Sequence, residues 1–510
     1  MPSLRRPRAV IATVAALATT AVGVALLLSG CTEAPPVSTI GAIPFDKPLA
    51  VPPLALSTVS ADGTRVFDLT ANEGESRFLP GAATPTAGYN GAYLGPTLRA
   101  SSGEKVEVHV HNKLTVTTTL HWHGMHLPAV ADGGPHQPIA PGAERDPAWT
   151  IDQPAATLWY HPHPHGETAG QVARGLAGMF ILDDPAERAL PLPRNYGVDD
   201  IPVIVQDVAF DAQNRLVQRD GGFVGALGDQ LLVDGTLHPF LDVTTDVVRL
   251  RLLNASPARV YNFAFSDNRA FAMIASDGGL LDASVPLDHI QLSPGERAEI
   301  LVTMAPGEKV VLQSHKADLG TPGAAAGFAG SSGGSDQFDV LQLRASATLA
   351  HVGEVPQRLV PVPRLDPAAA THERQFSMNG TEINGHDMDM SRIDVVVALG
   401  DTEIWDIRND MALPHSFHVH DEQFQLLDIA GAPPPPELSG WKDTIYLRPN
   451  TSYRLVLKFT DYADAKHPYM YHCHLLRHED DGMMGQFLVV EPGTKIPTTT
   501  TMEDDNHDHH

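Results

Sequence analysis

Four His-x-His pairs constrain the fold of this chain more than any other feature. The pairs are His121-Trp-His123, His161-Pro-His163, His418-Val-His420 and His472-Cys-His474. In extended backbone, residues i and i+2 lie on one face of a strand, so each pair directs two imidazoles to the same side. A single pair is common on an ordinary surface strand, but four pairs indicate a shared site. Eight imidazoles are too many for one metal ion and fit three ions with two or three ligands each.

The pairs fall in the first and last of three sequence repeats. Short alternating runs that end in Asn recur at Val106–Asn112, Val247–Asn254 and Glu403–Asn409, and the Asn positions are 142 and 155 residues apart. Turns recur at Pro141-Gly142, Pro294-Gly295 and Pro449-Asn450, and final strands at Leu176–Asp183, Phe338–Leu343 and Met483–Val490. This period is too long for a solenoid and fits three homologous antiparallel β-sandwiches. We expect an all-β protein with domains at 50–190, 195–347 and 370–492, the second being a spacer without metal.

A second set of candidate ligands faces away from the paired histidines. His415 lies three residues before His418, and Cys473 lies between His472 and His474, so both point to the opposite face. His478 and Met483 follow Cys473 closely. Two His, one Cys and a weak axial Met are the ligands of a blue-copper electron-transfer centre, whereas zinc prefers more thiolates or an open His/carboxylate site.

The N-terminus is predicted to be an export signal. Arg5 and Arg6 precede an apolar stretch, which ends in Leu28-Ser-Gly-Cys31. This box resembles the bacterial lipoprotein signal, so residues 1–30 are expected to be removed and Cys31 lipidated; an uncleaved membrane anchor is the alternative. Either way, the protein is held outside the cytoplasmic membrane. The Arg pair favours the twin-arginine route, but the apolar residues that usually follow it are missing, so the general route stays open. We expect a tether at 31–49 and a disordered His/Asp-rich tail at 493–510.

The net charge restricts the classes of binding partner, and the cysteine content bears on disulfide formation. The formal charge of −26 argues against nucleic acid and anionic lipid, and otherwise favours cations or only confers solubility. The two cysteines, Cys31 and Cys473, both have other predicted roles, so no disulfide is expected.

Four stretches that contain these residues resemble the signature motifs of the multicopper oxidases. They are Leu120-His-Trp-His-Gly124, Leu158-Trp-Tyr-His-Pro-His-Pro-His-Gly166, Pro414-His-Ser-Phe-His-Val-His420 and His472-Cys-His-Leu-Leu-Arg-His-Glu-Asp-Asp-Gly-Met-Met484. The resemblance covers most of residues 50–492 and implies three tandem cupredoxin-like Greek-key domains with four copper ions. One departure is Ser416, where the family usually has Pro.

The resemblance also implies a ligand for each ion. Type 1 copper takes His415, Cys473, His478 and Met483. Type 2 copper takes His121 and His418. The type 3 pair takes His123, His161 and His474 on one ion and His163, His420 and His472 on the other. His165 has no matching role.

By the same resemblance, a reductant gives electrons singly to the type 1 copper. They pass through Cys473 to His472 and His474, and four of them reduce O₂ to two waters. Glu479 and Asp132 are implied to relay protons, although Asp132 could instead only cap a turn. Asp443 is expected to order the region near the type 1 site.

The local sequences Ile383-Asn-Gly385 and Gly440-Trp-Lys-Asp-Thr444 are similar to those of the bacterial cuprous oxidases used in copper tolerance. The Met-rich insert of the best-known members is missing here. Thioethers and carboxylates suit Cu(I), so the candidate substrate residues are Asp410, Met411, Met388 and Met390, unless these methionines only fill core gaps. Three hypotheses stay open: a cuprous oxidase, a laccase-like oxidase of phenols or aromatic amines, and a copper-binding lipoprotein without turnover. A monomer is expected.

Overall fold

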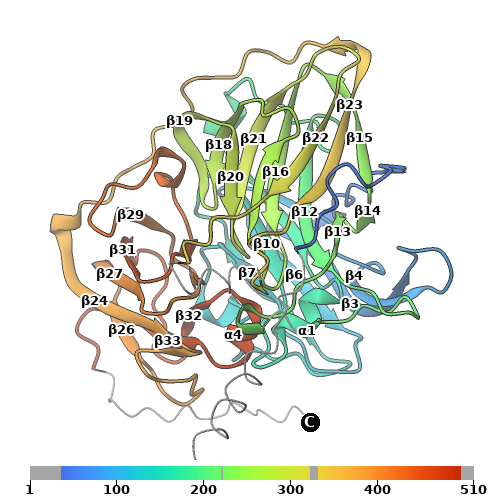
Figure 1. Ribbon diagram of the computed structural model, residues 1–510. Helices are drawn as coiled ribbons and strands as arrows, with labels where there is room; N and C mark the ends of the chain where they lie inside the picture. Colours follow the sequence, from blue (N-terminus) through green and yellow to red (C-terminus); the bar gives the residue numbers. More distant parts are fainter. Residues whose placement is uncertain (1–35, 220–221, 322–330, 496–510) are drawn as a thin grey trace, which may run out of the picture. The chain divides into compact units, whose positions relative to one another are not determined.

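The computed structural model describes residues 36–219, 222–321 and 331–495, and strands dominate throughout (Figure 1). The described residues form three pairs of β-sheets in chain order. The all-β, cupredoxin-like fold class is therefore confirmed. No helix among the described residues is long and apolar enough to cross a membrane. The predicted signal and Cys31 lie outside the described residues, as does the tail from residue 496.

The strands of the first pair of sheets are β2 (Ser57–Val59), β3 (Arg65–Ser76), β4 (Thr84–Tyr89), β5 (Leu98–Ser101), β6 (Lys105–Asn112), β7 (His121–His123), β8 (Glu144–Arg145), β9 (Ala148–Thr150), β10 (Ala156–His161) and β11 (Gly178–Asp183). The second pair contains β1 (Lys47–Pro48), β12 (Asp200–Val208), β13 (Gln230–Val233), β14 (Thr236–Leu237), β15 (Pro239–Thr245), β16 (Val247–Asn254), β17 (Tyr261–Phe265), β18 (Phe271–Ser276), β19 (Gly279–Leu287), β20 (His289–Leu292), β21 (Arg297–Thr303), β22 (Lys309–His315) and β23 (Phe338–Ala350).

The third pair contains β24 (Ala370–Asn379), β25 (Glu382–Ile383), β26 (Val395–Ala398), β27 (Thr402–Asn409), β28 (His415–Val419), β29 (Phe424–Ile429), β30 (Thr444–Leu447), β31 (Thr451–Lys458), β32 (Tyr469–Cys473) and β33 (Met484–Val490). Helices are short: α1 (Thr168–Ala173), α2 (Pro185–Arg188), α4 (Leu476–Asp480), and the 3₁₀ turns η1 (Ala129–Ala131), η2 (Gly222–Val224), η4 (Pro367–Ala369) and η5 (Pro436–Leu438).

The same strand pairing recurs in all three domains. An early strand pairs in parallel with the Asn-ended strand in β3–β6, β12–β16 and β24–β27. The last strand pairs in parallel with a short earlier one in β5–β11, β15–β23 and β26–β33. Each pair of sheets encloses its own apolar core. The sequence repeat therefore reflects one topology used three times.

The recurring Asn has a physical explanation. In each domain its side-chain oxygen accepts from the backbone N–H two residues on, and its amide donates to two backbone carbonyls. The acceptors are Val116 and Ile139 for Asn112, Arg259 and Leu292 for Asn254, and Leu413 and Leu447 for Asn409. A buried amide that satisfies three backbone groups fixes the end of its strand.

The expected tether at 31–49 is in part fixed to the second domain. Strand β1 pairs in parallel with β15, and Val37 and Leu49 pack against the core of this domain. The backbone N–H of Val37 donates to Asp336, and that of Gly41 donates to Asp339. Residues 36–49 therefore form part of the second domain, because the edge of its sheet leaves backbone groups to pair with.

Candidate metal centres

The four His-x-His strands form two neighbouring pairs. Strand β10 pairs with β7, which sets His161 opposite His121, and β28 pairs with β32, which sets His418 opposite His472. The two pairs of strands belong to the first and third domains. Their imidazoles meet across the interface: the rings of His123 and His418 stack with centroids 3.7 Å apart, and those of His121 and His420 at 3.8 Å. All eight side chains are buried.

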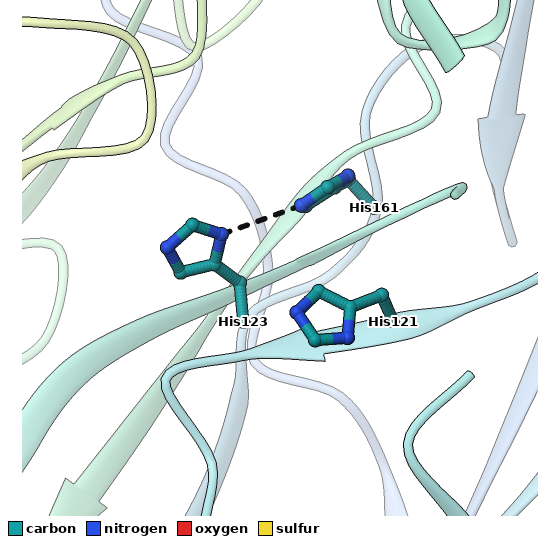
Figure 2. Close-up of side chains that lie close together, drawn as sticks. All are labelled: His121, His123 and His161. Carbon is teal, nitrogen blue, oxygen red and sulfur yellow. Dashed lines mark hydrogen bonds between the residues drawn. The ribbon is translucent and has the colours of Figure 1, made fainter. Parts of the chain in front are cut away.

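The spacing of the ring nitrogens fits metal ions. His123 Nδ1 lies 3.4 Å from His161 Nε2 (Figure 2). The Nε2 atom of His472 lies 3.2 Å from that of His163 and 3.3 Å from that of His420. Nitrogens bound to one ion at about 2.0 Å in near-tetrahedral geometry lie roughly 3.3 Å apart. The donor set therefore fits polynuclear metal binding, while the division of ligands among individual ions stays a prediction.

The two histidines predicted for type 2 copper have the same hydrogen-bond arrangement. Nδ1 of His121 donates to the backbone oxygen of Asp132, and Nδ1 of His418 donates to that of Asp443. Each hydrogen bond fixes the tautomer and leaves Nε2 without a partner in a buried site. An orphaned buried acceptor is costly unless something else binds it, and a metal ion would do so.

Three carboxylates each join one histidine of the first domain to one of the third. Asp132 places one carboxylate oxygen 3.3 Å from Nδ1 of His121 and the other 2.8 Å from Nδ1 of His420. Glu479 lies 3.3 Å from His163 and 3.2 Å from His472.

Asp443 is the third bridging carboxylate. Its Oδ1 lies 2.9 Å from Nε2 of His123 and 3.7 Å from Nδ1 of His418. Such carboxylates orient metal-binding imidazoles and raise their basicity. The expectation that Asp443 orders the type 1 region is wrong. Strand β30 begins at Thr444 opposite His418, whereas His415 lies at the other end of this pairing, opposite Leu447.

Burial favours the neutral imidazole at seven positions of the cluster. It lowers the pKa of His123, His161, His163, His418, His420 and His472 well below the usual value, and that of His474 to about 3. Desolvation is the main cause, and the neighbouring imidazoles add to it in each case. Burial also raises the pKa of Glu479 well above its ordinary value, so this carboxyl group can hold a proton beside the cluster. Neutral imidazole is the form that binds metals.

The second ligand set also assembles. The sulfur of Cys473 lies 3.5 Å from Nδ1 of His415 and 3.4 Å from Nδ1 of His478, and these two nitrogens are 3.2 Å apart. Met483 is buried beside them, and its backbone is hydrogen-bonded to Cys473 and His478. Burial raises the pKa of the Cys473 thiol to about 12, so a bound metal ion would have to displace its proton.

The tripeptide His472-Cys473-His474 joins the two centres. His472 faces the polynuclear cluster, and Cys473 faces His415 and His478 from the opposite side of β32. In addition, His472 Nδ1 donates to the backbone oxygen of Cys473 over 3.2 Å. Covalent bonds and one hydrogen bond therefore connect the thiolate site to the cluster.

Known proteins resemble this chain in both sequence and fold. Residues 70–187 and 360–493 match family models described as multicopper oxidase. Multicopper oxidase mco of Staphylococcus epidermidis is 35% identical over 446 residues, which cover 86% of this chain and 92% of that protein. The chain belongs to the multicopper oxidase family. As a multicopper oxidase, it is a copper-dependent oxidoreductase that uses O₂ and a reducing substrate.

Two further similarities show how widely this fold is used. The cell division protein FtsP of Escherichia coli is 36% identical, over 88% of this chain and 95% of that protein. The crystal structure of a laccase from Pediococcus acidilactici matches with a TM-score of 0.79 at 36% identity, over 88% of this chain and 95% of that one.

The candidate substrate residues of this multicopper oxidase lie at two places. Asp410 accepts a hydrogen bond from Ser377 over 2.6 Å and pairs with Arg408 at 2.5 Å, so both of its carboxylate oxygens are engaged. Met388 lies instead beside the type 1 loop, where its backbone N–H donates to Gly482. Met390 lies in the same segment, and its backbone oxygen accepts from Gln486.

Sequence reasoning missed two residues of the second domain, one that contacts a predicted ligand and one that contacts Asp443. Phe223, in η2 of the second domain, has its ring 4.5 Å from that of His478, and its backbone oxygen accepts from His478 Nε2 over 2.8 Å. Arg297 binds Asp443 through both carboxylate oxygens. The only signal for Arg297 was its charge and its position two residues after the recurring turn at Pro294-Gly295. His165, which has no predicted role, is exposed.

Proposed function

We propose that this multicopper oxidase oxidises Cu(I) to Cu(II) and contributes to copper tolerance. Four such oxidations supply the electrons that, with four protons, convert O₂ to two waters. Copper in the predicted sites supplies the one-electron chemistry and the binding of O₂. The chain supplies the connection through Cys473, the orientation of the imidazoles, and a proton-holding carboxyl group at Glu479.

The observation that carries this proposal is the surface over His478. Its Nε2 is already engaged by the backbone of Phe223, so a phenol has no direct hydrogen bond to this imidazole. What adjoins it is a shallow depression of about 260 Å³, lined by Gly222, Phe223, Thr381, Arg477, His478 and Asp481. A small polar depression suits an ion better than an aromatic ring, which needs a larger apolar pocket.

Soft and charged ligands lie close to this depression. Met388 and Asp387 lie beside Gly482, the residue that follows Asp481. The side chain of Asp481 is half-exposed, and its oxygen lies 3.5 Å from Arg477. Thioether and carboxylate together suit Cu(I) capture and Cu(II) release. The geometry therefore favours Met388 over the Asp410–Met411 pair for the substrate ion.

Two other functions are distinguishable from this one. A laccase-like oxidation of phenols or aromatic amines is supported by the structural likeness to a laccase. A copper-binding role without turnover is compatible with the likeness to FtsP, whose name describes cell division. Copper binding without turnover does not need the thiolate centre at Cys473, and this chain has all the predicted ligands of that centre.

Oxygen uptake by the copper-loaded enzyme with Cu(I) and with a phenol tests the proposal. We expect faster uptake with Cu(I), and we expect Met388→Leu to raise its KM about tenfold, which corresponds to about 1.4 kcal/mol. If Met411→Leu raised the KM for Cu(I) and Met388→Leu did not, Asp410 and Met411 would be the better candidates for the Cu(I) site. Faster uptake with the phenol would favour the laccase-like activity, and no uptake with either would favour the binding role.

We also propose that the protein is an exported lipoprotein anchored through Cys31. The sequence Leu28-Ser-Gly-Cys31 supports this. Substitution Cys31→Ser should abolish labelling by a fatty acid and move the protein from the membrane fraction. If the variant stayed in that fraction, an uncleaved anchor would be the better explanation.

A further inference from the structure

We propose that the second domain takes part in metal binding, through Gly295 and Arg297. Of these positioning residues, Gly295 belongs to the recurring turn of that domain, and Arg297 is the first residue of β21. The sequence predicted only a spacer here, because the domain contains no His-x-His pair. The contacts of these two residues lead directly to predicted copper ligands in the other two domains.

Arg297 joins all three domains. It is fully buried, and its Nε donates to the backbone oxygen of Thr157 over 2.9 Å. Thr157 belongs to β10, the strand that ends at His161. The guanidinium also donates to the backbone oxygens of Gly295 and Asp277 in its own domain, over 3.1 and 2.9 Å.

The remaining donors of Arg297 bind the third domain. Nη1 donates to Asp443 Oδ1 over 2.6 Å, and Nη2 donates to Asp443 Oδ2 over 2.7 Å. This bidentate pairing fixes both the position and the plane of the carboxylate, which a lysine ammonium cannot do. Asp443 Oδ1 in turn accepts from His123 Nε2 over 2.9 Å. The proton of His123 is thereby held on Nε2, and its Nδ1 is left facing His161 as a metal ligand.

Gly295 acts on another histidine. Its φ is +86°, and a Cβ atom added to it would lie 3.1 Å from three atoms of the His474 imidazole. Neither ring nitrogen of His474 has a hydrogen-bond partner. The backbone of this turn therefore packs against a ring that no hydrogen bond orients. A side chain at position 295 would push on His474 and would also be strained at this φ.

Arg259 provides a matched control. It is as buried as Arg297 and lies in the same domain, and it pairs with Asp207 at 2.8 Å and Asp336 at 2.7 Å. Both partners belong to the second domain, and neither contacts a predicted ligand. Loss of Arg259 therefore reproduces the cost of breaking a buried ion pair without moving Asp443.

The test compares Arg297→Lys, Arg297→Met, Gly295→Ala and Arg259→Met. Four readouts are needed: copper bound per chain when the copper-free protein is titrated, the blue absorption of the Cys473 centre, the electron paramagnetic resonance of the type 2 ion, and the Tm of the copper-free protein. The blue absorption serves as an internal reference, because the side-chain contacts that join Cys473, His415 and His478 involve neither Gly295 nor Arg297.

We expect both Arg297 variants and Gly295→Ala to lower copper affinity at the cluster about 10- to 100-fold and to change the type 2 spectrum. The blue absorption per chain should stay unchanged. Arg259→Met should lower Tm but keep full copper and the native spectrum. If Arg297→Met does not fold, Arg297→Lys decides, since it keeps the buried charge. The proposal is wrong if the Arg297 and Gly295 variants lower only Tm, as Arg259→Met does, with copper content and type 2 spectrum unchanged.

Discussion

The backbone of Ser416 provides a test of how the chain sets the potential of its type 1 centre. Ser416 O accepts a hydrogen bond from His474 N over 2.6 Å. The N–H and C=O of one strand residue point to the same side, so the N–H of Ser416 faces Cys473. This backbone group and that of Leu475 both lower the pKa of the Cys473 thiol, as N–H donors to the sulfur do. The family usually has Pro at this position, which removes the first of these donors.

We predict that Ser416→Pro lowers the reduction potential. An N–H donor favours the more electron-rich sulfur of the reduced centre, and hydrogen bonding around this sulfur is a recognised control of the potential. A hydrogen bond to a charged group contributes about 1.5–3 kcal/mol, but it is present in both oxidation states. If about 1 kcal/mol of it is specific to the reduced state, the shift is about 40 mV, since about 1.4 kcal/mol corresponds to about 59 mV for one electron.

The assay is a redox titration of the blue absorption of purified protein. Ser416→Ala is the control, because it keeps the N–H and removes only the contacts of the Ser416 hydroxyl with Ser293, 2.9 Å away, and with the backbone oxygen of Pro294, 3.5 Å away. Proline should be tolerated, because this N–H serves the sulfur and not the strand ladder. An unchanged or higher potential in Ser416→Pro, or an equal drop in Ser416→Ala, would refute the reasoning.

Three further predictions concern the cluster and the surface of the type 1 site. Glu479→Gln should lower kcat about 100-fold by removing the proton-holding carboxyl group, with the blue absorption retained; normal turnover at neutral pH would contradict this role. Phe223→Ala should widen the depression and raise kcat/KM for phenols relative to Cu(I), which oxygen uptake with both substrates checks against wild type. Burial lowers the pKa of His474 from 6.5 to about 3 and that of His478 to about 4. At these two positions the unfolded chain therefore binds more protons than the folded chain below pH 6.5, and the Tm of the copper-free protein should fall as pH falls from 6.5 towards 4. A Tm that rose over this range would contradict the prediction.

Much of the site could be predicted because it depends on local geometry. A His-x-His pair in a strand directs both imidazoles to one face whatever surrounds it, and Cys473 between two such residues must face the other way. The threefold recurrence of Asn at strand ends likewise gave the domain repeat, and the structure explains it by hydrogen bonds that stay within each domain.

The position of Asp443 illustrates what local reasoning could not supply. Its sequence neighbours gave no indication that it bridges His123 and His418, and it was assigned to the wrong copper centre. The register between β28 and β30 decides which end of the strand it meets, and a shift by a few residues would have moved it to His415. The candidate Cu(I) ligands show the same limit. Asp410 has the right chemistry, but Ser377 and Arg408 occupy its carboxylate oxygens.

The sequence by itself therefore determined the fold class, the family, and which histidines could share a face. Covalent geometry with a period of two residues is enough for those conclusions. Only the tertiary structure decided that three carboxylates each connect the first domain to the third, and that Arg297 of a domain without metal ligands holds one of them. These contacts join residues that are far apart in the sequence, and the packing of whole domains sets them, which no local pattern records.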